Sequence, residues 1–353
     1  MQSPVKPSPR RAKVLHLITL SVVGGSQDNT FGTCERHDRS RFEVHLATNS
    51  TGRWVDRARA SADAFHPIDS YVTPPSPLND LKSLVATTRL LRRERYDILH
   101  THTAKAGFIG RLAARFAPVP IVVHTYHAFP WHDHMSGTKR GVFIGMERLV
   151  RDGTQYHITV SENERQEGLR RRVLRESDSR TIYSGIDFTK LDRPVDRDAI
   201  RASFGWGPRE RVIGMVGRLD AQKAPELMVQ AFARVAAADP LARLMIVGDG
   251  ELRPNVEERI RSLGLGDKVK LLGFRDDVPS LVEASDIFAL SSLWEGLGRA
   301  MTEAMLVGKA VVVPAINGIP EIVHEGRTGL LYPAGQVDKL ADGILRLLAD
   351  PAL

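Results

Sequence analysis

Two glutamates separated by seven residues are the side chains of this sequence best placed to do chemistry. Glu295 stands just before a glycine-spaced turn in SSLWEGLGRAMTEAMLVGK, residues 291–309, and Glu303 stands among apolar residues of a segment typical of a core helix. An ionised carboxylate costs free energy when it leaves water unless a hydrogen bond or a cation compensates it. We therefore expect Glu303, set in the apolar helix face, either to pair with an internal arginine or to face a ligand, with Glu295 at the mouth of the helix.

The local pattern around these acids predicts a strand, a loop and a helix that ends at Gly308. In that arrangement Glu295 could accept hydrogen bonds from sugar hydroxyls. Glu303, about two helical turns further on, could accept both hydroxyls of a ribose. The backbone N–H groups at the helix start could face a phosphate; these belong to residues 296–299, which include Gly296, Leu297 and Gly298.

Two further segments carry groups suited to phosphate. GRLDAQKAPELM places Arg218 and Lys223 between a predicted strand and a helix, where two cations and the helix N-terminus favour a diphosphate. Gly24 and Gly25 follow the first strand in LSVVGGSQDNT, and missing side chains let backbone N–H groups approach a phosphate. A solvated loop explains the cations too, and a plain tight turn explains the glycines about as well. The GxGxxG dinucleotide fingerprint is absent here.

Histidines gather in the first half of the sequence. His100 and His102 stand in YDILHTHTAKAG, and His124 and His127 in PIVVHTYHAFPWHDH. This raises the hypothesis of zinc, but no cysteine joins them and strand alternation places some on opposite faces. We therefore expect no metal site. We expect His127, at the end of its strand, to enter a binding cleft, and His100 and His124 to pack or hydrogen-bond within the sheet.

The segments that must position these residues alternate between short apolar strands and amphipathic helices, which is typical of parallel sheets covered by helices. Such open sheets bind ligands at the carboxyl ends of their strands. The predicted fold is therefore α/β, with two Rossmann-like, doubly wound parallel-sheet domains facing a cleft. We predict a disordered basic tail at 1–12, a first domain at 13–190, a linker at 191–209 and a second domain at 210–353.

Composition agrees with a folded, two-domain protein. The chain has 353 residues, and 42% of them are hydrophobic. The single cysteine, Cys34, excludes an internal disulfide and favours a reducing compartment, with the cytoplasm as the default. No apolar stretch approaches the roughly 20 residues that a membrane-spanning helix needs.

The charge is unevenly distributed along the chain. Residues 1–195 carry 30 Lys and Arg against 20 Asp and Glu, a net charge of +10, whereas residues 196–353 carry 19 against 22, or −3. The basic runs could be solvated helix faces, or they could meet an anionic membrane, a phosphorylated acceptor or nucleic acid. No nucleic-acid module is recognisable, so we expect no nucleic-acid partner.

Several segments together resemble the retaining glycosyltransferases of family 4. The resemblance rests on EGLGRAMTEAMLVGKAVVVPAINGIPEIVHEGRTGLLYP with its two spaced glutamates, and on GRLDAQKAPELM, VGDGEL, VVGGSQDNT and HTHTAKAGFIGRLAA. It covers nearly the whole chain. It implies the GT-B fold, in which two Rossmann-like domains face a cleft and the C-terminal domain holds most of a nucleotide sugar.

The resemblance implies roles for the phosphate-binding candidates. Arg218 and Lys223 would neutralise the donor diphosphate and the charge that grows as the leaving group departs. Gly24 and Gly25 would approach the same phosphates from the first domain. The basic pair would do the work of a metal ion, so no metal and no other cofactor is expected.

The remaining candidates would hold the sugar and the nucleoside. Glu295 would hold hydroxyls of the transferred sugar, and His127 would lie near the sugar and the β-phosphate. Glu303 would hold the ribose, and the nucleobase would rest near Gly273 and Phe274 in LLGFRDDV.

The expected function is retaining transfer of a sugar from a nucleotide sugar, UDP-sugar first and GDP-sugar second. The expected acceptor is a glycan or a polyprenyl-diphosphate-linked sugar in surface polysaccharide biosynthesis. An anionic acceptor suits the basic first half, and we expect a cytoplasmic protein that is peripheral on the inner membrane face. The alternatives are a nucleotide-sugar 2-epimerase of similar fold and a catalytically silent nucleotide-sugar-binding protein.

Two departures from the family pattern accompany the resemblance. Ala128 follows His127 where the family commonly has glycine, so the local pocket is expected to differ. The sequence ends at ADPAL, and the family implies further helices after this point that cross back to the first domain.

Overall fold

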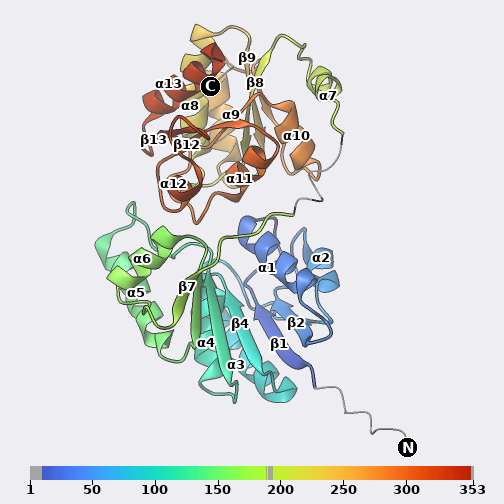
Figure 1. The fold of residues 1–353 in the computed structure, drawn as a ribbon, viewed down its shortest axis with the longest axis vertical. Coiled ribbons are helices and arrows are strands. Elements are labelled where there is room, and N and C mark those ends of the chain that lie inside the picture. The colour runs from blue at the N-terminus through green and yellow to red at the C-terminus, as the bar shows by residue number, and fades with distance from the viewer. Residues whose placement is uncertain (1–9, 188, 190–193, 351–353) are drawn as a thin grey trace, which may run out of the picture. The chain divides into compact units, whose positions relative to one another are not determined.

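A computed structural model describes residues 10–187, 189 and 194–350 of the chain. The chain divides into two compact units, residues 1–183 and residues 184–353 (Figure 1). Each unit is an open parallel β-sheet with helices packed on it. The predicted fold class of two Rossmann-like, doubly wound domains is confirmed.

The described part of the first unit contains a seven-stranded sheet in the order β3-β2-β1-β4-β5-β6-β7. Its strands are β1 (Ala12–Leu17), β2 (Phe42–Thr48), β3 (Ala64–Pro67), β4 (Ile98–His102), β5 (Ile121–Tyr126), β6 (Tyr156–Thr159) and β7 (Ser179–Thr181). Its helices are α1 (Gly25–Arg36), α2 (Val55–Ala60), α3 (Pro77–Glu94), α4 (Ala104–Ala114), α5 (Gly137–Arg151) and α6 (Glu162–Arg170).

The described part of the second unit contains a six-stranded sheet in the order β10-β9-β8-β11-β12-β13. Its strands are β8 (Arg211–Val216), β9 (Ala242–Val247), β10 (Val269–Leu271), β11 (Ile287–Ala289), β12 (Ala310–Pro314) and β13 (Leu330–Tyr332). Its helices are α7 (Arg197–Ser203), α8 (Pro225–Ala238), α9 (Arg253–Ser262), α10 (Val278–Ala284), α11 (Arg299–Leu306), α12 (Ile319–Ile322) and α13 (Val337–Ala349).

Strand order reverses direction once in each sheet. The reversal lies between β1 and β4 in the first unit and between β8 and β11 in the second. In open parallel sheets, the loops that leave neighbouring strands at such a reversal run to opposite faces, and ligands bind there, at the carboxyl ends of the strands. The sequence places Gly24, Arg218, Lys223 and Glu295 in these loops.

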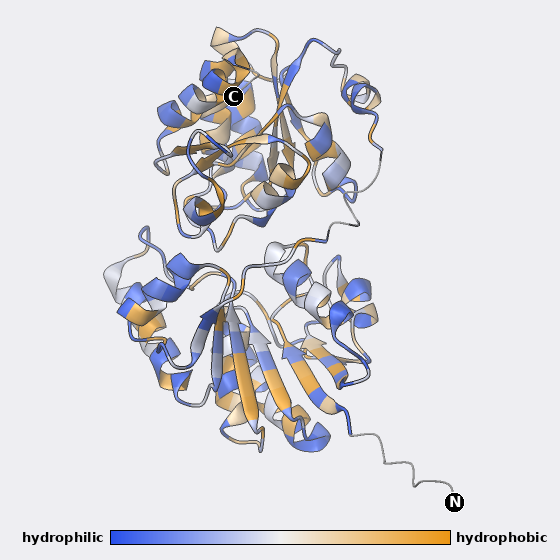
Figure 2. Ribbon diagram, viewed as in Figure 1, coloured by the Kyte–Doolittle hydropathy of each residue, from blue (hydrophilic) through white to orange (hydrophobic). Residues whose placement is uncertain are grey.

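Apolar residues are concentrated on the strands of both units (Figure 2). A strand of a parallel sheet is covered on both faces, so runs such as Arg211–Val216 are apolar nearly throughout. The largest core cluster of the second unit joins α8 and α13 to this sheet through residues such as Phe232 and Ile344, both fully buried. Both sheets have well-packed apolar cores that hold the loops at their carboxyl ends in place.

The predicted tail and the predicted linker lie only partly within the described residues. Residues 1–9 of the predicted tail and residues 191–193 of the predicted linker lie outside the described residues, and β1 begins at Ala12. Within the rest of the predicted linker, α7 forms because Asp196 accepts a hydrogen bond from the N–H of Ala199 at 2.9 Å. Buried Arg201 on α7 then donates to Asp286 at 2.7 Å. This stretch, interpreted from sequence as linker, packs on the second unit.

Among the described helices, none combines the length and the apolar character that crossing a bilayer requires.

A buried ionic network joins α4, α5 and β5 in the first unit. The Arg111 guanidinium, fully buried, donates to Glu147 at 2.7 Å, and the Tyr126 hydroxyl donates to the same carboxylate oxygen at 2.9 Å. Arg111 also donates to the backbone oxygen of Gly107 at 2.8 Å. Removing one member of such a network leaves an uncompensated charge in the interior.

We therefore expect Glu147→Ala to destabilise the first unit by about 3–5 kcal/mol, because Arg111 keeps its charge without a counterion. The measurement is urea unfolding followed by circular dichroism. Glu258→Ala, which breaks an exposed pair with Arg261, should leave the midpoint unchanged. A native-like midpoint for Glu147→Ala would contradict this account of the interior.

Candidate functional site

Two loops of the second unit meet at the carboxyl edge of its sheet. Residues 217–224 follow β8, and residues 290–298 follow the neighbouring strand β11. The N–H of Leu293 donates to the backbone oxygen of Gln222 at 2.8 Å, and the Gln222 amide donates to the backbone oxygen of Trp294 at 3.0 Å. The structure thus brings together the cationic segment and the first glutamate, which the sequence separates by about seventy residues.

Lys223 and Glu295 form an ion pair between these loops. The Lys223 ammonium donates to Oε1 of Glu295, and the Ser292 hydroxyl donates to the same oxygen at 2.7 Å. The Glu295 side chain is 6% exposed and that of Lys223 is 16% exposed. Oε2 of Glu295 accepts no hydrogen bond from the described residues, so it is available to a ligand.

Arg218 lies on the same loop as Lys223 but is far more exposed. Its guanidinium pairs with Asp220 at 3.0 Å and donates to the Gln222 side chain at 3.3 Å, and its side chain is 53% exposed. Asp220 and Gln222 therefore hold the Arg218 guanidinium at the edge of the site. Its charge can turn towards an anion at little desolvation cost.

Glu303 corrects the expectation from sequence. It lies on α11, but its side chain is 33% exposed, whereas Met301 and Ala304 on the same helix are fully buried. Successive helical residues are rotated by about 100°, so an acid next to buried positions in sequence can still lie at the edge of the apolar stripe. Of the two glutamates, Glu295 is the buried one. Arg299 lies 3.9 Å from Glu303 one turn earlier, so the expected arginine neighbour is present at a long distance.

The loop between the two glutamates presents backbone donors. Among the described residues, none accepts a hydrogen bond from the N–H of Gly296, Leu297 or Gly298. Gly298 has φ +80°, a left-handed conformation that favours glycine, and it immediately precedes α11. Asn317 supports the loop by accepting from the N–H of Glu295 at 3.1 Å. Free N–H groups at a helix start form an anion-binding arrangement.

Gly273 and Phe274 follow β10, at the carboxyl edge of the same sheet. The N–H of Gly248 donates to the backbone oxygen of Gly273 at 2.8 Å, and the Phe274 ring is 44% exposed. An exposed ring held on a fixed turn provides a surface on which a planar base can stack.

Gly24 and Gly25 begin α1 of the first unit. Gly24 has an extended backbone, and a Cβ there would lie 2.7 Å from Oε1 of Gln27. The backbone oxygen of Gly24 accepts from the N–H of Asp28 at 2.9 Å. The glycine pair therefore forms the helix start that the sequence predicted.

Histidines form a hydrogen-bonded row on one face of the first sheet. His127, partly exposed, contacts His102 at 3.2 Å between ring nitrogens, and His102 contacts His16 at 3.1 Å. His16 contacts His37 at 2.9 Å. His100 lies beside this row. Burial lowers the pKa of His16 and of His102 well below the ordinary value, and that of His100 to about 3, so these rings are neutral at pH 7.

The expectation for His100 and His124 is confirmed. His124 points to the opposite face and contacts the Thr101 hydroxyl at 2.8 Å, and His100 contacts Thr125 at 2.8 Å, so both hydrogen-bond within the sheet. His16, His100 and His102 share the other face of the sheet. His16 and His37 were not predicted as members of the row, and the one histidine in KVLHLITL was the available signal.

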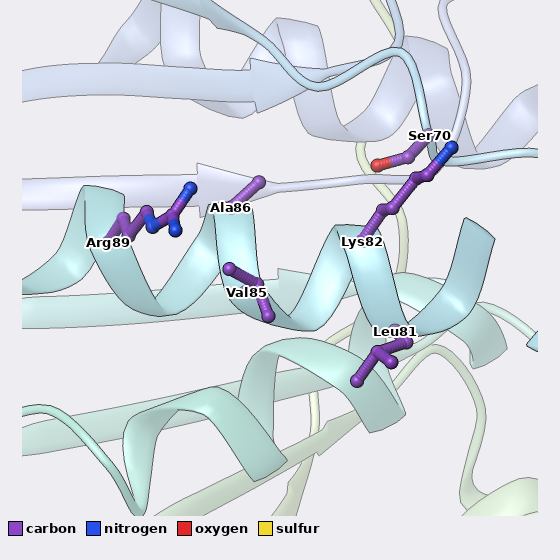
Figure 3. A pocket seen from close by; sticks show the side chains of 6 residues that line it. All are labelled: Ser70, Leu81, Lys82, Val85, Ala86 and Arg89. Atoms are coloured by element: carbon purple, nitrogen blue, oxygen red, sulfur yellow. The ribbon is translucent and has the colours of Figure 1, made fainter. Parts of the chain in front are cut away.

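A pocket on the first unit does not coincide with these residues. Five of its lining side chains come from α3 and one from the loop after β3 (Figure 3): Ser70, Leu81, Lys82, Val85, Ala86 and Arg89. None of the candidate site residues lines this pocket.

Both units are similar to known protein families. Residues 23–190 match the family model Glycosyltransferase Family 4, and residues 196–353 match the model Glycosyl transferases group 1. The chain is 29% identical to the UDP-Gal:alpha-D-GlcNAc-diphosphoundecaprenol alpha-1,3-galactosyltransferase of Escherichia coli, over 99% of this chain and 91% of that protein. It is 31% identical to the D-inositol 3-phosphate glycosyltransferase of Rhodococcus opacus, over 73% of this chain and 60% of that protein.

A solved structure is similar over almost the whole chain. HepE of Anabaena in complex with UDP and glucose has 25% sequence identity and a TM-score of 0.83. The match covers 97% of this chain and 91% of HepE.

Gly248 packs directly against the start of the loop that carries Arg218 and Lys223. It has φ +132°, and a Cβ there would lie 1.9 Å from the backbone oxygen of Gly217, next to Arg218. We expect Gly248→Ala to destabilise the second unit by about 2 kcal/mol or more, because both the backbone conformation and the Gly217 turn must change. Thermal unfolding measures this effect.

The matched control is Gly266→Ala, where a Cβ meets open space and φ is not in the left-handed region. This variant should unfold close to the native temperature. Equal stability of the two variants would show that the close approach of residues 217 and 248 does not constrain the loop.

Proposed function

Because the chain belongs to the glycosyltransferases, with a Family 4 first domain and a group 1 second domain, we propose that it transfers a sugar from a UDP-sugar with retention of the anomeric configuration. The observation that carries the proposal is the junction of Lys223 and Glu295 beside the N–H groups of residues 296–298, which have no acceptor among the described residues. A buried acid stands there next to donors suited to phosphate, and only one of its oxygens is held by described side chains. GDP-sugar is the second choice of donor.

The proposed diphosphate site combines backbone dipoles and cations. The N–H groups of residues 296–298 bind phosphate oxygens, and Arg218 turns from Asp220 to the same charge. Lys223 has three N–H donors, and Glu295 engages one of them. As the bond between the anomeric carbon and the phosphate oxygen breaks, negative charge grows on the leaving group, and these fixed donors stabilise it. We propose that no metal ion is required for this step.

The proposed sugar site is built around Glu295. Lys223 and Ser292 hold Oε1, which orients the buried carboxylate, and Oε2 accepts hydrogen bonds from sugar hydroxyls. Holding these hydroxyls fixes the anomeric carbon next to the leaving phosphate. An acceptor hydroxyl then attacks the anomeric carbon from the face that the phosphate leaves, through an oxocarbenium-like state, and its proton passes to the departing phosphate oxygen. Attack on this face retains the configuration.

The nucleoside is proposed to lie along the carboxyl edge of the second sheet. Glu303, one-third exposed, accepts the ribose hydroxyls, and the base stacks near Gly273 and Phe274. In the first domain, Gly24, Gly25 and His127 are the groups proposed to contact the donor. HepE supports this choice of donor class because its structure contains UDP and glucose.

The proposed acceptor is a sugar linked to a polyprenyl diphosphate, in surface polysaccharide biosynthesis. The Escherichia coli relative is named for a diphosphoundecaprenol-linked acceptor. The net charge of +10 on residues 1–195 supports an anionic acceptor and an anionic membrane surface, and we propose that the protein works at the inner face of the membrane.

The test uses the full chain with a panel of UDP- and GDP-sugars and a polyprenyl-diphosphate-linked sugar. We expect acceptor-dependent release of UDP and a product whose new linkage keeps the donor's anomeric configuration by NMR. Conversion of the donor without acceptor would indicate an epimerase, and inversion would refute the stereochemical proposal. Binding of donor without either reaction, across the panel, would indicate a silent binding protein.

Two substitutions test the central pair. Glu295→Gln removes the charge that Lys223 and Ser292 orient, and Lys223→Ala leaves Glu295 buried without a counterion. We expect each to lower kcat/KM about 100-fold or more, in line with the loss of one preorganised electrostatic contact. Lys339→Ala, which changes an exposed cation on α13, is the control and should retain activity. Full activity in either site variant would remove the pair from the mechanism.

The role of Glu303 is tested by binding of the free nucleotide. Titration calorimetry with UDP and with 2′,3′-dideoxy-UDP should show about 10-fold tighter binding of UDP to the native chain, the order of one to two hydrogen bonds. Glu303→Ala should bind both nucleotides alike, because the hydroxyls have lost their acceptor. If the variant still prefers UDP as strongly as the native chain does, another group reads the ribose.

A further inference from the structure

Three histidines of the first domain converge on one face of the sheet where strand order reverses. His16 on β1 lies in register with His100 on β4, and His102 lies two residues further along β4, on the same face. Their ring centroids are 4.3, 4.9 and 5.3 Å apart. One ring nitrogen from each, taken together, all lie within 4.8 Å of one another.

Each of these rings has its second nitrogen held by a neighbour. Metal-binding imidazoles characteristically show this arrangement, because the outer hydrogen bond fixes the tautomer and the orientation of the ring. The holding contacts are His16 Nε2 to His37 at 2.9 Å, His102 Nδ1 to His127 at 3.2 Å and His100 Nε2 to Thr125 at 2.8 Å.

The nitrogens that remain on His16 and His102 face each other. His16 Nδ1 and His102 Nε2 are 3.1 Å apart. Two imidazole nitrogens bound to one tetrahedral zinc ion, each at about 2.0–2.1 Å, lie roughly 3.3 Å apart. With Nε2 held by Thr125, Nδ1 is the nitrogen that His100 offers, and it has no hydrogen-bond partner among the described residues.

We propose that His16, His100 and His102 form a binding site for a divalent transition ion of the zinc type. The ion takes the place of the proton shared by His16 and His102 and draws in the His100 ring, with a fourth position left for water or another ligand. Three neutral imidazoles favour zinc or cobalt over magnesium, which prefers oxygen ligands. The site does not depend on the proposed sugar transfer.

Burial shows how an ion would reach the site. His16 is fully buried and His102 is 1% exposed, whereas His100 is partly exposed. The ion therefore enters past the His100 ring. The interior around His16 and His102 has a low dielectric constant, which strengthens the interaction of the ion with the ring nitrogens.

The test is titration of the full chain, stripped of metal with a chelator, with Zn²⁺ in competition with a chromophoric chelator. We expect one tight site per chain, and intense tetrahedral d–d absorption when Co²⁺ replaces Zn²⁺. His102→Gln and, separately, His100→Asn should weaken Zn²⁺ binding about 100-fold or more, beyond the effect of losing an outer partner. Mg²⁺ should not compete.

His124→Gln is the matched control, because His124 is buried on the same sheet but points to the opposite face and contacts Thr101. It should bind Zn²⁺ as the native chain does. Circular dichroism of each variant without metal shows whether it is folded. His100→Asn is expected to disturb folding less than His102→Gln, because His100 is partly exposed and His102 is buried. No tight Zn²⁺ binding by the native chain, or native-like binding by both His102→Gln and His100→Asn, would overturn the proposal.

Discussion

The ion pair between Lys223 and Glu295 is the interaction on which the candidate site depends. Glu295 is nearly inaccessible to water, and an ionised carboxylate in that position needs a cation and a hydrogen-bond donor. Lys223 supplies the first and Ser292 the second. Because the pair links loops that leave neighbouring strands, it fixes the Arg218 segment and the donor loop of residues 296–298 relative to each other.

The parallel sheet makes this pairing possible. With β8 and β11 side by side and pointing the same way, their following loops start at the same edge. The backbone at Gly248 also packs closely against the loop after β8, because a glycine there leaves room for the backbone oxygen of Gly217. A side chain at Gly248 would collide with the Gly217 backbone, and one at Gly217 would crowd the Lys223 side chain, which is the counterion of Glu295. The site is therefore a consequence of strand order and of missing side chains.

Much of this arrangement was predictable from the sequence, because it follows from local patterns. Alternating strands and helices predicted the two sheets, and the glycine-spaced turn predicted the loop before α11. Burial was harder to predict, because it depends on which side of a helix packs. Glu303 looked buried by its neighbours in sequence and lies at the edge of the apolar stripe, whereas Glu295, in a polar-looking loop, is covered.

The packing of α7 and the row of histidines could not be predicted from the sequence, because both depend on contacts between distant segments. Asp286, across the second unit, accepts from Arg201 and anchors α7 in a stretch whose composition resembles a linker. The histidine row joins β1, β4 and β5 with His37, and no single segment shows that His16 and His102 touch. Strand alternation correctly separated His124, but it could not show that three other histidines share a face, because that depends on the register between strands.

The same geometry separates the two cations that the sequence presented as one clamp. Lys223 is held in place by Glu295 and is largely buried, so its position is fixed before any ligand binds. Arg218 is half-exposed and held only at the rim by Asp220 and Gln222. We infer that Lys223 chiefly holds the Glu295 carboxylate in place, whereas Arg218 follows the charge of a bound phosphate. A fixed ion pair and an adjustable cation suit a reaction in which the sugar must be held still while the leaving group moves away.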